Sequence, residues 1–166
     1  MARVAAMARR MLSPASEMSR APYTKVSFKT APPACEIPEP PMPADPTISV
    51  IDDDASVREA LEAFLRSAGF RTQSFASAEQ FLDSGRLEDT ACLILDVRMP
   101  GMSGVELQER LIAAGSAVPI IFISAHSDED ARARALERGA VEFFRKPFPD
   151  DALLGAIARA VGAAAH

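Results

Sequence analysis

The chain has 166 residues, of which 48% are apolar and 25% charged, and this suits one globular domain with a single core. No run approaches the roughly 18 consecutive apolar residues that span a bilayer, so we do not expect a membrane protein. The presence of only two cysteines argues against a disulfide framework and favours a reducing, cytoplasmic setting.

The first 46 residues differ in composition from the rest of the chain. They hold nine of the thirteen prolines and carry six basic against four acidic residues. The stretch APPACEIPEPPMPADP cannot sustain a helix or a central strand, because proline removes a hydrogen-bond donor and restricts the residue before it. We therefore predict a disordered, proline-rich extension over residues 1–46. A transit peptide, an incorrect start site upstream of Met42 and an expression remnant are alternative interpretations of its beginning.

From residue 47 onward, short apolar runs alternate with segments of helical periodicity. Strands are predicted at 47–51, 70–75, 91–96, 118–124 and 140–144. Helices are predicted at 55–69, 77–85, 104–115, 127–139 and 149–165. Parallel strands need crossover helices, so five such alternations predict an α/β fold. The expected architecture is a doubly wound, five-stranded parallel sheet in the order 2-1-3-4-5, with helices on both faces.

Capping residues are predicted at three helix starts. Asp54 is a candidate N-cap of the first helix, and Ser77 with Gln80 forms a capping pattern at the second. Ser127 and Asp130 supply the capping chemistry expected at the fourth.

Three consecutive aspartates, Asp52, Asp53 and Asp54, follow the first strand, where ordinary folding would avoid them. Two carboxylates about 4 Å apart repel by roughly 4 kcal/mol at an effective dielectric constant of about 20. Asp96 ends the third strand, which is the neighbour of the first in the predicted order. We therefore expect these carboxylates to converge at the carboxyl ends of the strands, which form the edge of the sheet where doubly wound folds bind ligands.

A hydroxyl and an amine are expected at the same edge. Ser124 ends the fourth strand, and Lys146 follows the fifth. Either residue alone is also an ordinary strand-end or surface residue, and only their joint placement favours a site. Clustered carboxylates suit a hard dication such as Mg²⁺, and one of them can then act as a nucleophile towards a phosphoryl group. The lysine and the hydroxyl would stabilise the charge that is transferred.

Four segments, VIDDD, LILDVRMPGMSGVEL, FISAH and FFRKPF, resemble in order and spacing the receiver domain of bacterial two-component response regulators. The resemblance implies a flavodoxin-like, three-layer receiver domain over residues 47–165. It further implies that Asp96 is the phosphoacceptor, which takes a phosphoryl group from a sensor histidine kinase or a phosphotransfer protein. Mg²⁺ would be bound by Asp53, Asp96 and the backbone carbonyl of Arg98, with Asp52 acting through a water molecule.

The same resemblance assigns roles at the ends of the last two strands. Ser124 and Lys146 would contact the phosphoryl group, and Phe143 would be the aromatic switch residue. The Lys146–Pro147 peptide bond is expected to be cis, a form that is essentially confined to proline. Phosphorylation would then change the surface formed by the last two helices and the last strand.

We expect the protein to be a signalling phosphoacceptor and not an enzyme, since it would catalyse only its own phosphorylation and dephosphorylation. A phosphorylation-dependent homodimer is one possible output, and the sequence does not identify a downstream protein target. Residues 47–166 carry twelve basic and nineteen acidic residues, a net charge of −7, so we do not expect direct binding of nucleic acid. Because the sequence stops close to the last helix, we expect a stand-alone receiver.

Two other functions stay open at this stage. A phosphorylation-independent interaction module on the same fold would not need Asp96. A phosphatase of the haloacid-dehalogenase kind also uses a nucleophilic aspartate, a hydroxyl and a lysine around Mg²⁺. That class has a second acid two residues after the nucleophile, where this chain has Arg98.

Overall fold

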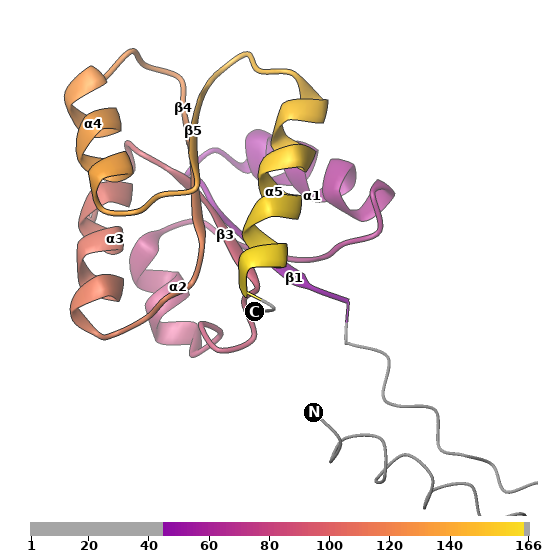
Figure 1. The fold of residues 1–166 in the computed structure, drawn as a ribbon, viewed down its shortest axis with the longest axis horizontal. Coiled ribbons are helices and arrows are strands. Elements are labelled where there is room, and N and C mark those ends of the chain that lie inside the picture. The colour runs from indigo at the N-terminus through magenta and orange to yellow at the C-terminus, as the bar shows by residue number, and fades with distance from the viewer. Residues whose placement is uncertain (1–44, 165–166) are drawn as a thin grey trace, which may run out of the picture. The chain divides into compact units, whose positions relative to one another are not determined.

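A computed structural model describes residues 45–164, and most of the predicted extension, residues 1–44, lies outside the described residues. These residues form one parallel sheet in the order β2-β1-β3-β4-β5 with five helices (Figure 1). The strands are β1 (Thr47–Ile51), β2 (Arg71–Phe75), β3 (Cys92–Asp96), β4 (Ile120–Ser124) and β5 (Glu142–Arg145). The helices are α1 (Ala55–Ser67), α2 (Ala78–Ser84), α3 (Gly104–Ala113), α4 (Glu129–Glu137) and α5 (Asp150–Ala164).

Every predicted element is present, and each boundary lies within two residues of the predicted one. The predicted strand order is confirmed as well. Within the described part of the chain, no helix is both long enough and apolar enough to cross a bilayer.

The helices cover both faces of the sheet, with α1 and α5 on one face and α2, α3 and α4 on the other (Figure 1). Alternate side chains of a strand point to opposite faces, so β3 contributes Leu93 and Leu95 to one core and Cys92 and Ile94 to the other. A strand that is covered on both faces needs an unbroken apolar run. Packing on both faces thereby fixes the positions of the strand ends relative to one another.

The first two helices begin as predicted. The Asp54 carboxylate accepts a hydrogen bond from Ser56 N at 2.9 Å and caps α1. Ser77 Oγ accepts one from Gln80 N at 3.1 Å and caps α2. Asp54 therefore serves a helix end, and this separates its role from those of the two aspartates before it.

The start of α4 differs from the prediction. The N-cap is Asp128 and not Ser127 or Asp130, because the Asp128 carboxylate accepts a hydrogen bond from Ala131 N at 3.0 Å. Three neighbouring residues have side chains that can cap a helix, so local sequence does not choose among them. The second carboxylate oxygen of Asp128 pairs with Arg98 from another loop, and this tertiary contact favours the middle residue.

Candidate functional site

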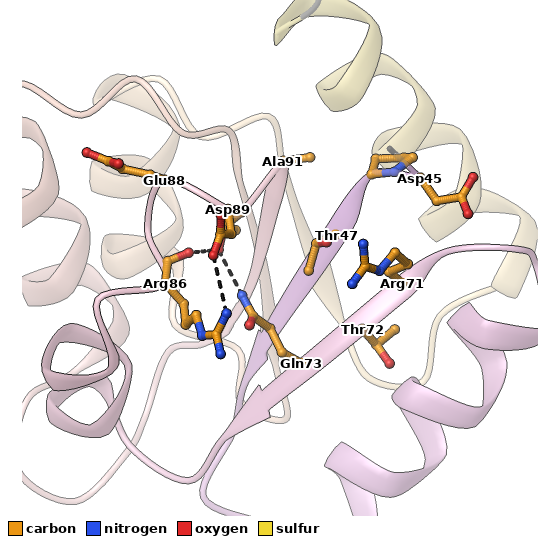
Figure 2. A pocket seen from close by; sticks show the side chains of 11 residues that line it. Asp45, Thr47, Arg71, Thr72, Gln73, Arg86, Glu88, Asp89 and Ala91 are labelled. Atoms are coloured by element: carbon orange, nitrogen blue, oxygen red, sulfur yellow. Dashed lines mark hydrogen bonds and ion pairs between the residues drawn. The ribbon is translucent and has the colours of Figure 1, made fainter. Parts of the chain in front are cut away.

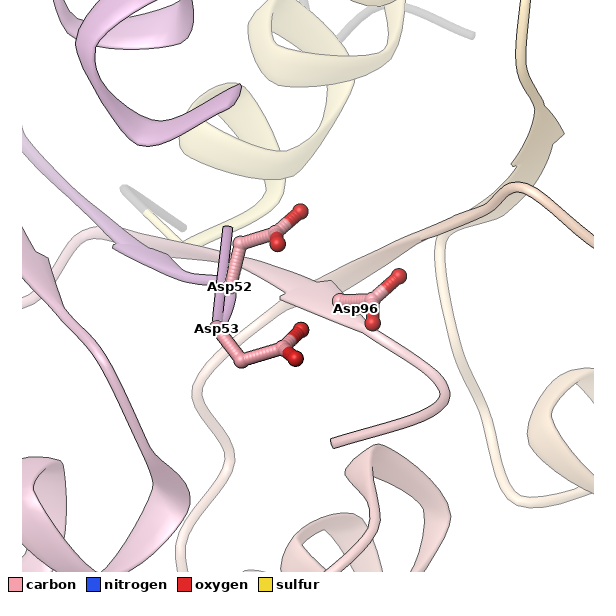
Figure 3. Close-up of side chains that lie close together, drawn as sticks. All are labelled: Asp52, Asp53 and Asp96. Carbon is pink, nitrogen blue, oxygen red and sulfur yellow. The ribbon is translucent and has the colours of Figure 1, made fainter. Parts of the chain in front are cut away.

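Three aspartates meet where β1 and β3 end (Figure 3). One carboxylate oxygen from each of Asp52, Asp53 and Asp96 lies within 4.8 Å of the other two. Ile51 and Leu95 are paired across the two parallel strands, so Asp52 and Asp96 follow from neighbouring positions. The structure thus brings together the three predicted acidic site residues on adjacent strand ends.

The crowding of these carboxylates changes the ionisation of Asp96. Burial of the side chain, and next the negative charge of Asp52, raise the pKa of Asp96 from 3.8 to about 6, while the positive charge of Lys146 acts in the opposite direction. Asp96 as a whole is only 9% exposed. The site therefore holds more negative charge than its surroundings balance, and a cation placed among the three carboxylates would relieve the repulsion.

Lys146 lies at the same edge and contacts Asp52. Its Nζ donates to Asp52 Oδ2 at 3.2 Å, and the Asp52 side chain is only 5% exposed. Asp52 Oδ1 also accepts a hydrogen bond from Asp54 N at 2.9 Å, which fixes the orientation of the carboxylate. The lysine predicted to contact a phosphoryl group is thus already in the site, where it is paired with an aspartate.

Ser124 is buried at the end of β4, one residue beyond the Ile123 that pairs with Asp96. Its Oγ accepts a hydrogen bond from His126 N and contacts His126 O, both at 3.1 Å, within the loop between β4 and α4. The backbone N of Lys146 donates to Ser124 O at 2.8 Å. The ends of β4 and β5 are therefore linked, and the hydroxyl must exchange a local partner before it can bind a ligand.

Phe143 lies on β5 and is buried, with its ring stacked on that of Phe122 at a centroid separation of 6.0 Å. Both rings belong to the core beneath α2, α3 and α4. The Lys146–Pro147 peptide bond is cis, as the resemblance implies. An inward-facing Phe143 is compatible with the switch position assigned to it, and that role stays a prediction.

Gly104 makes a contact that the sequence analysis missed. A Cβ atom at this position would lie 2.2 Å from the backbone oxygen of Asp96, so a side chain cannot be added without a shift of the strand end. Gly104 N also donates to Val97 O at 3.0 Å, which closes the loop after β3. The available signal was the second glycine of MPGMSG, directly after the Ser103 that caps α3.

The partner of the Arg98 side chain was not predicted. Its Nη2 donates to Asp128 Oδ2 at 3.3 Å, across a sequence separation of thirty residues. No local pattern reports a pair so far apart in the chain. The contact joins the loop after β3 to the start of α4.

The described residues also line a pocket of about 610 Å³ at the opposite edge of the sheet (Figure 2). Thr47 and Arg71, the first residues of β1 and β2, line it together with Gln73 and Thr90. Gln73 Nε2 donates to Thr90 Oγ1 at 3.2 Å. None of the predicted site residues lines this pocket, so it is separate from the acidic edge where those residues meet.

Comparison with known sequences decides the family. The model of the response regulator receiver domain matches residues 48–158. The chain belongs to this family. A relative of the receiver chain, response regulator protein TmoT of Ectopseudomonas mendocina, is 50% identical over 115 residues, which cover 69% of this chain and 52% of that protein. Transcriptional regulatory protein FixJ of Azorhizobium caulinodans is 40% identical over 125 residues, which cover 75% of this chain and 59% of that protein.

Solved structures agree with this family and with the predicted flavodoxin-like fold. The receiver chain matches response regulator StyR with a TM-score of 0.69 and 52% identity, over 74% of this chain and 62% of that one. It matches FixJ-N with a TM-score of 0.65 and 38% identity, over 71% of this chain and 94% of that one. The receiver chain spans about half the length of the curated relatives it matches. The phosphatase and interaction-module alternatives gain no support from these comparisons.

Proposed function

We propose that this receiver domain accepts one phosphoryl group on Asp96 from a sensor histidine kinase or a phosphotransfer protein. Receiver domains of response regulators are phosphorylated by histidine kinases, and the chain belongs to that family. The observation that carries the proposal for this chain is the convergence of Asp52, Asp53 and Asp96 within 4.8 Å. Lys146 contacts this cluster, as a phosphoryl-binding cation should.

We propose Mg²⁺ as the cofactor, bound by Asp53, Asp96 and the backbone carbonyl of Arg98, with Asp52 acting through water. The residues present fit this ion, because Mg²⁺ prefers oxygen ligands and uses one or two carboxylates together with waters and phosphate oxygens. When bound, Mg²⁺ supplies positive charge that offsets the carboxylate repulsion and the charge of the phosphoryl group.

The chemistry at the protein side is a nucleophilic displacement. An oxygen of Asp96 forms a bond to phosphorus while the bond from phosphorus to the imidazole nitrogen of the donor breaks, and the bonding electrons return to that nitrogen. With a pKa of about 6, Asp96 is mostly ionised at neutral pH and so can act as the nucleophile. Lys146 then exchanges Asp52 for a phosphoryl oxygen, and the Ser124 hydroxyl exchanges its contact with His126 for another.

The output follows from the same contacts. Movement of Ser124 and Lys146 would bias the loops after β4 and β5, and Phe143 would respond from within the core. We propose that the surface of α4, β5 and α5 changes with phosphorylation and binds a downstream protein or a second receiver.

We also propose that the domain works in the cytoplasm, where its buried free Cys92 stays reduced. Three of the relatives are named transcriptional regulatory proteins. For the receiver domain itself we propose no direct contact with nucleic acid, because of its net negative charge.

The test is phosphorylation in vitro with acetyl phosphate, or with a phosphorylated cognate kinase, in the presence of Mg²⁺. We expect the wild-type protein to gain one acid-labile phosphoryl group and Asp96→Asn to gain none. Asp54→Asn is the matched control, since it changes the same acidic run outside the cluster and asparagine still caps a helix. Equal labelling of wild type and Asp96→Asn, or no labelling of wild type by either donor, would refute the proposal.

A further inference from the structure

Arg98 and Asp128 connect the two loops that flank the proposed phosphoryl position. Arg98 follows Asp96 by two residues, and Asp128 lies four residues after Ser124, at the start of α4. Their side chains pair at 3.3 Å, with the arginine 59% and the aspartate 28% exposed. An ion pair this open to solvent is weak, so a stronger anion nearby can displace one partner.

The two ends of α4 are attached differently. The helix buries only two of its residues, Ala131 and Ala135, so apolar packing holds it lightly. Near its carboxyl end, Gln108 of α3 donates to Ala135 O at 3.0 Å. Arg138, the C-cap residue, pairs with Glu109 of α3 at 2.7 Å.

At its amino end, α4 is tied to the loop after β3 by the Arg98–Asp128 pair. Because the ties to α3 lie at the other end of the helix, loss of this pair would loosen only the first turn.

We propose that Arg98 is a phosphoryl-binding residue whose guanidinium is paired with Asp128 until the phosphoryl group forms. A phosphoryl group on Asp96 would draw the Arg98 guanidinium away from Asp128 and so release the first turn of α4, while the last turn stays fixed to α3. This inference rests on the proposed function, because it needs the phosphoryl group to be formed on Asp96. It adds a direct link from this chain's own Arg98 to the helix that the phosphorylated state must move.

The competition favours the phosphoryl group on chemical grounds. A phosphoryl group carries a charge of about −1.5 to −2 and offers three acceptor oxygens, whereas Asp128 carries a single charge and already uses one carboxylate oxygen to cap α4. A guanidinium forms paired hydrogen bonds to such an anion, which lysine cannot do. Asp128 keeps its hydrogen bond to Ala131 after Arg98 leaves, so the helix stays capped as it is released.

The experiment uses the full chain with Mg²⁺ and trifluoroberyllate, which mimics a phosphoryl group on a carboxylate. The variants are Arg98→Gln, Asp128→Asn and their combination, since asparagine keeps the N-cap and removes the charge. Arg132→Gln is the matched control, because Arg132 pairs with Glu129 on the exposed face of the same helix at 3.8 Å. Two readouts are needed: trifluoroberyllate affinity from NMR titration, and amide hydrogen exchange over residues 131–133.

We expect Arg98→Gln to weaken trifluoroberyllate binding about fivefold and Asp128→Asn to strengthen it about threefold, the scale set by a weak exposed ion pair and its replacement by an arginine–phosphoryl contact. In the Arg98→Gln background, Asp128→Asn should have no effect on binding. Amide exchange in the first turn should rise about threefold when the wild-type protein binds trifluoroberyllate. The two single variants should show that faster exchange without trifluoroberyllate, and Arg132→Gln should not.

Equal trifluoroberyllate affinity of wild type and Arg98→Gln would overturn the proposal, as would an effect of Asp128→Asn that does not depend on Arg98. If Asp128→Asn does not fold, Asp128→Ser supplies a second N-cap variant for the same comparison. If wild type binds no trifluoroberyllate and gains no phosphoryl group, the proposed function fails. The role of the Arg98–Asp128 pair in holding the first turn of α4 is then tested in the unmodified protein, where equal amide exchange in wild type and both single variants would refute it.

Discussion

The amino-terminal and carboxyl-terminal edges of the sheet, where the parallel strands begin and end, differ in the kind of buried polar groups that they carry. Towards the amino-terminal edge, Ser49 in the middle of β1 lies beside Thr90, with 2.7 Å between Ser49 Oγ and Thr90 Oγ1, and Gln73 Nε2 donates to Ser49 Oγ at 2.7 Å. At the carboxyl-terminal edge, Asp52, Asp53 and Asp96 lie close together, and burial and then the charge of Asp52 raise the pKa of Asp96. Neutral polar groups that bond to one another cost little when buried, whereas buried like charges destabilise the fold until a ligand offsets them. The difference marks one edge as structural and the other as functional.

The largest effect is expected where the backbone supports the acidic edge. Gly104→Ala would place a Cβ against Asp96 O, so we expect it to lower the free energy of unfolding by about 3 kcal/mol, the upper part of the range for overpacking. Gly155→Ala is the control, because no atom outside its own stretch of helix lies within 4 Å of its Cβ position and alanine is the better helix former. Urea denaturation measures both. Equal stability of the two variants would show that the strand end tolerates a side chain.

Ionised Asp96 should destabilise the acidic edge, because its carboxylate is buried and lies beside that of Asp52. The raised pKa of Asp96 means that the folded state binds more protons than the unfolded state between about pH 4 and pH 6, so this group lowers stability as pH rises through that window. In metal-free protein, we expect Asp96→Asn to raise the free energy of unfolding by about 2 kcal/mol at about pH 8 and to have little effect at about pH 4. Denaturation with a chelator present measures this. A destabilised Asp96→Asn at the higher pH would remove the contrast between the edges.

The structural edge should respond to a neutral change. Ser49→Ala removes an oxygen that contacts both Gln73 and Thr90, so we expect a loss of about 1 to 2 kcal/mol, because buried partners are left with fewer bonds. The loss should be the same across pH, and phosphorylation of Asp96 should be unchanged. A pH-dependent loss, or a change in phosphorylation, would mean that the two edges are coupled.

The smallest effect is expected for surface charge near the structural edge. Arg86 and Asp89 pair at 3.4 Å, but their side chains are 60% and 64% exposed. Arg86→Gln should therefore change the free energy of unfolding by less than about 0.5 kcal/mol. A larger loss in urea denaturation would show that charge matters at this edge as well.

The sequence by itself determined the alternation of strands and helices, because apolar runs and helical periodicity are local and each predicted boundary lies within two residues of the observed one. It also predicted that Asp52, Asp53 and Asp96 would meet, since residues at the ends of neighbouring parallel strands must lie together. The helix caps at Asp54 and Ser77 follow equally local rules.

Only the tertiary structure decided which side chains pair across loops. The contacts of Lys146 with Asp52 and of Arg98 with Asp128 join residues far apart in sequence, and each of the two aspartates is followed by two further acidic residues that could form the same pair. The close approach of Gly104 to Asp96 depends likewise on how α3 packs at the end of β3. Periodicity fixes which face of an element is buried, but the choice among polar partners at an edge depends on distances that exist only after the layers have packed.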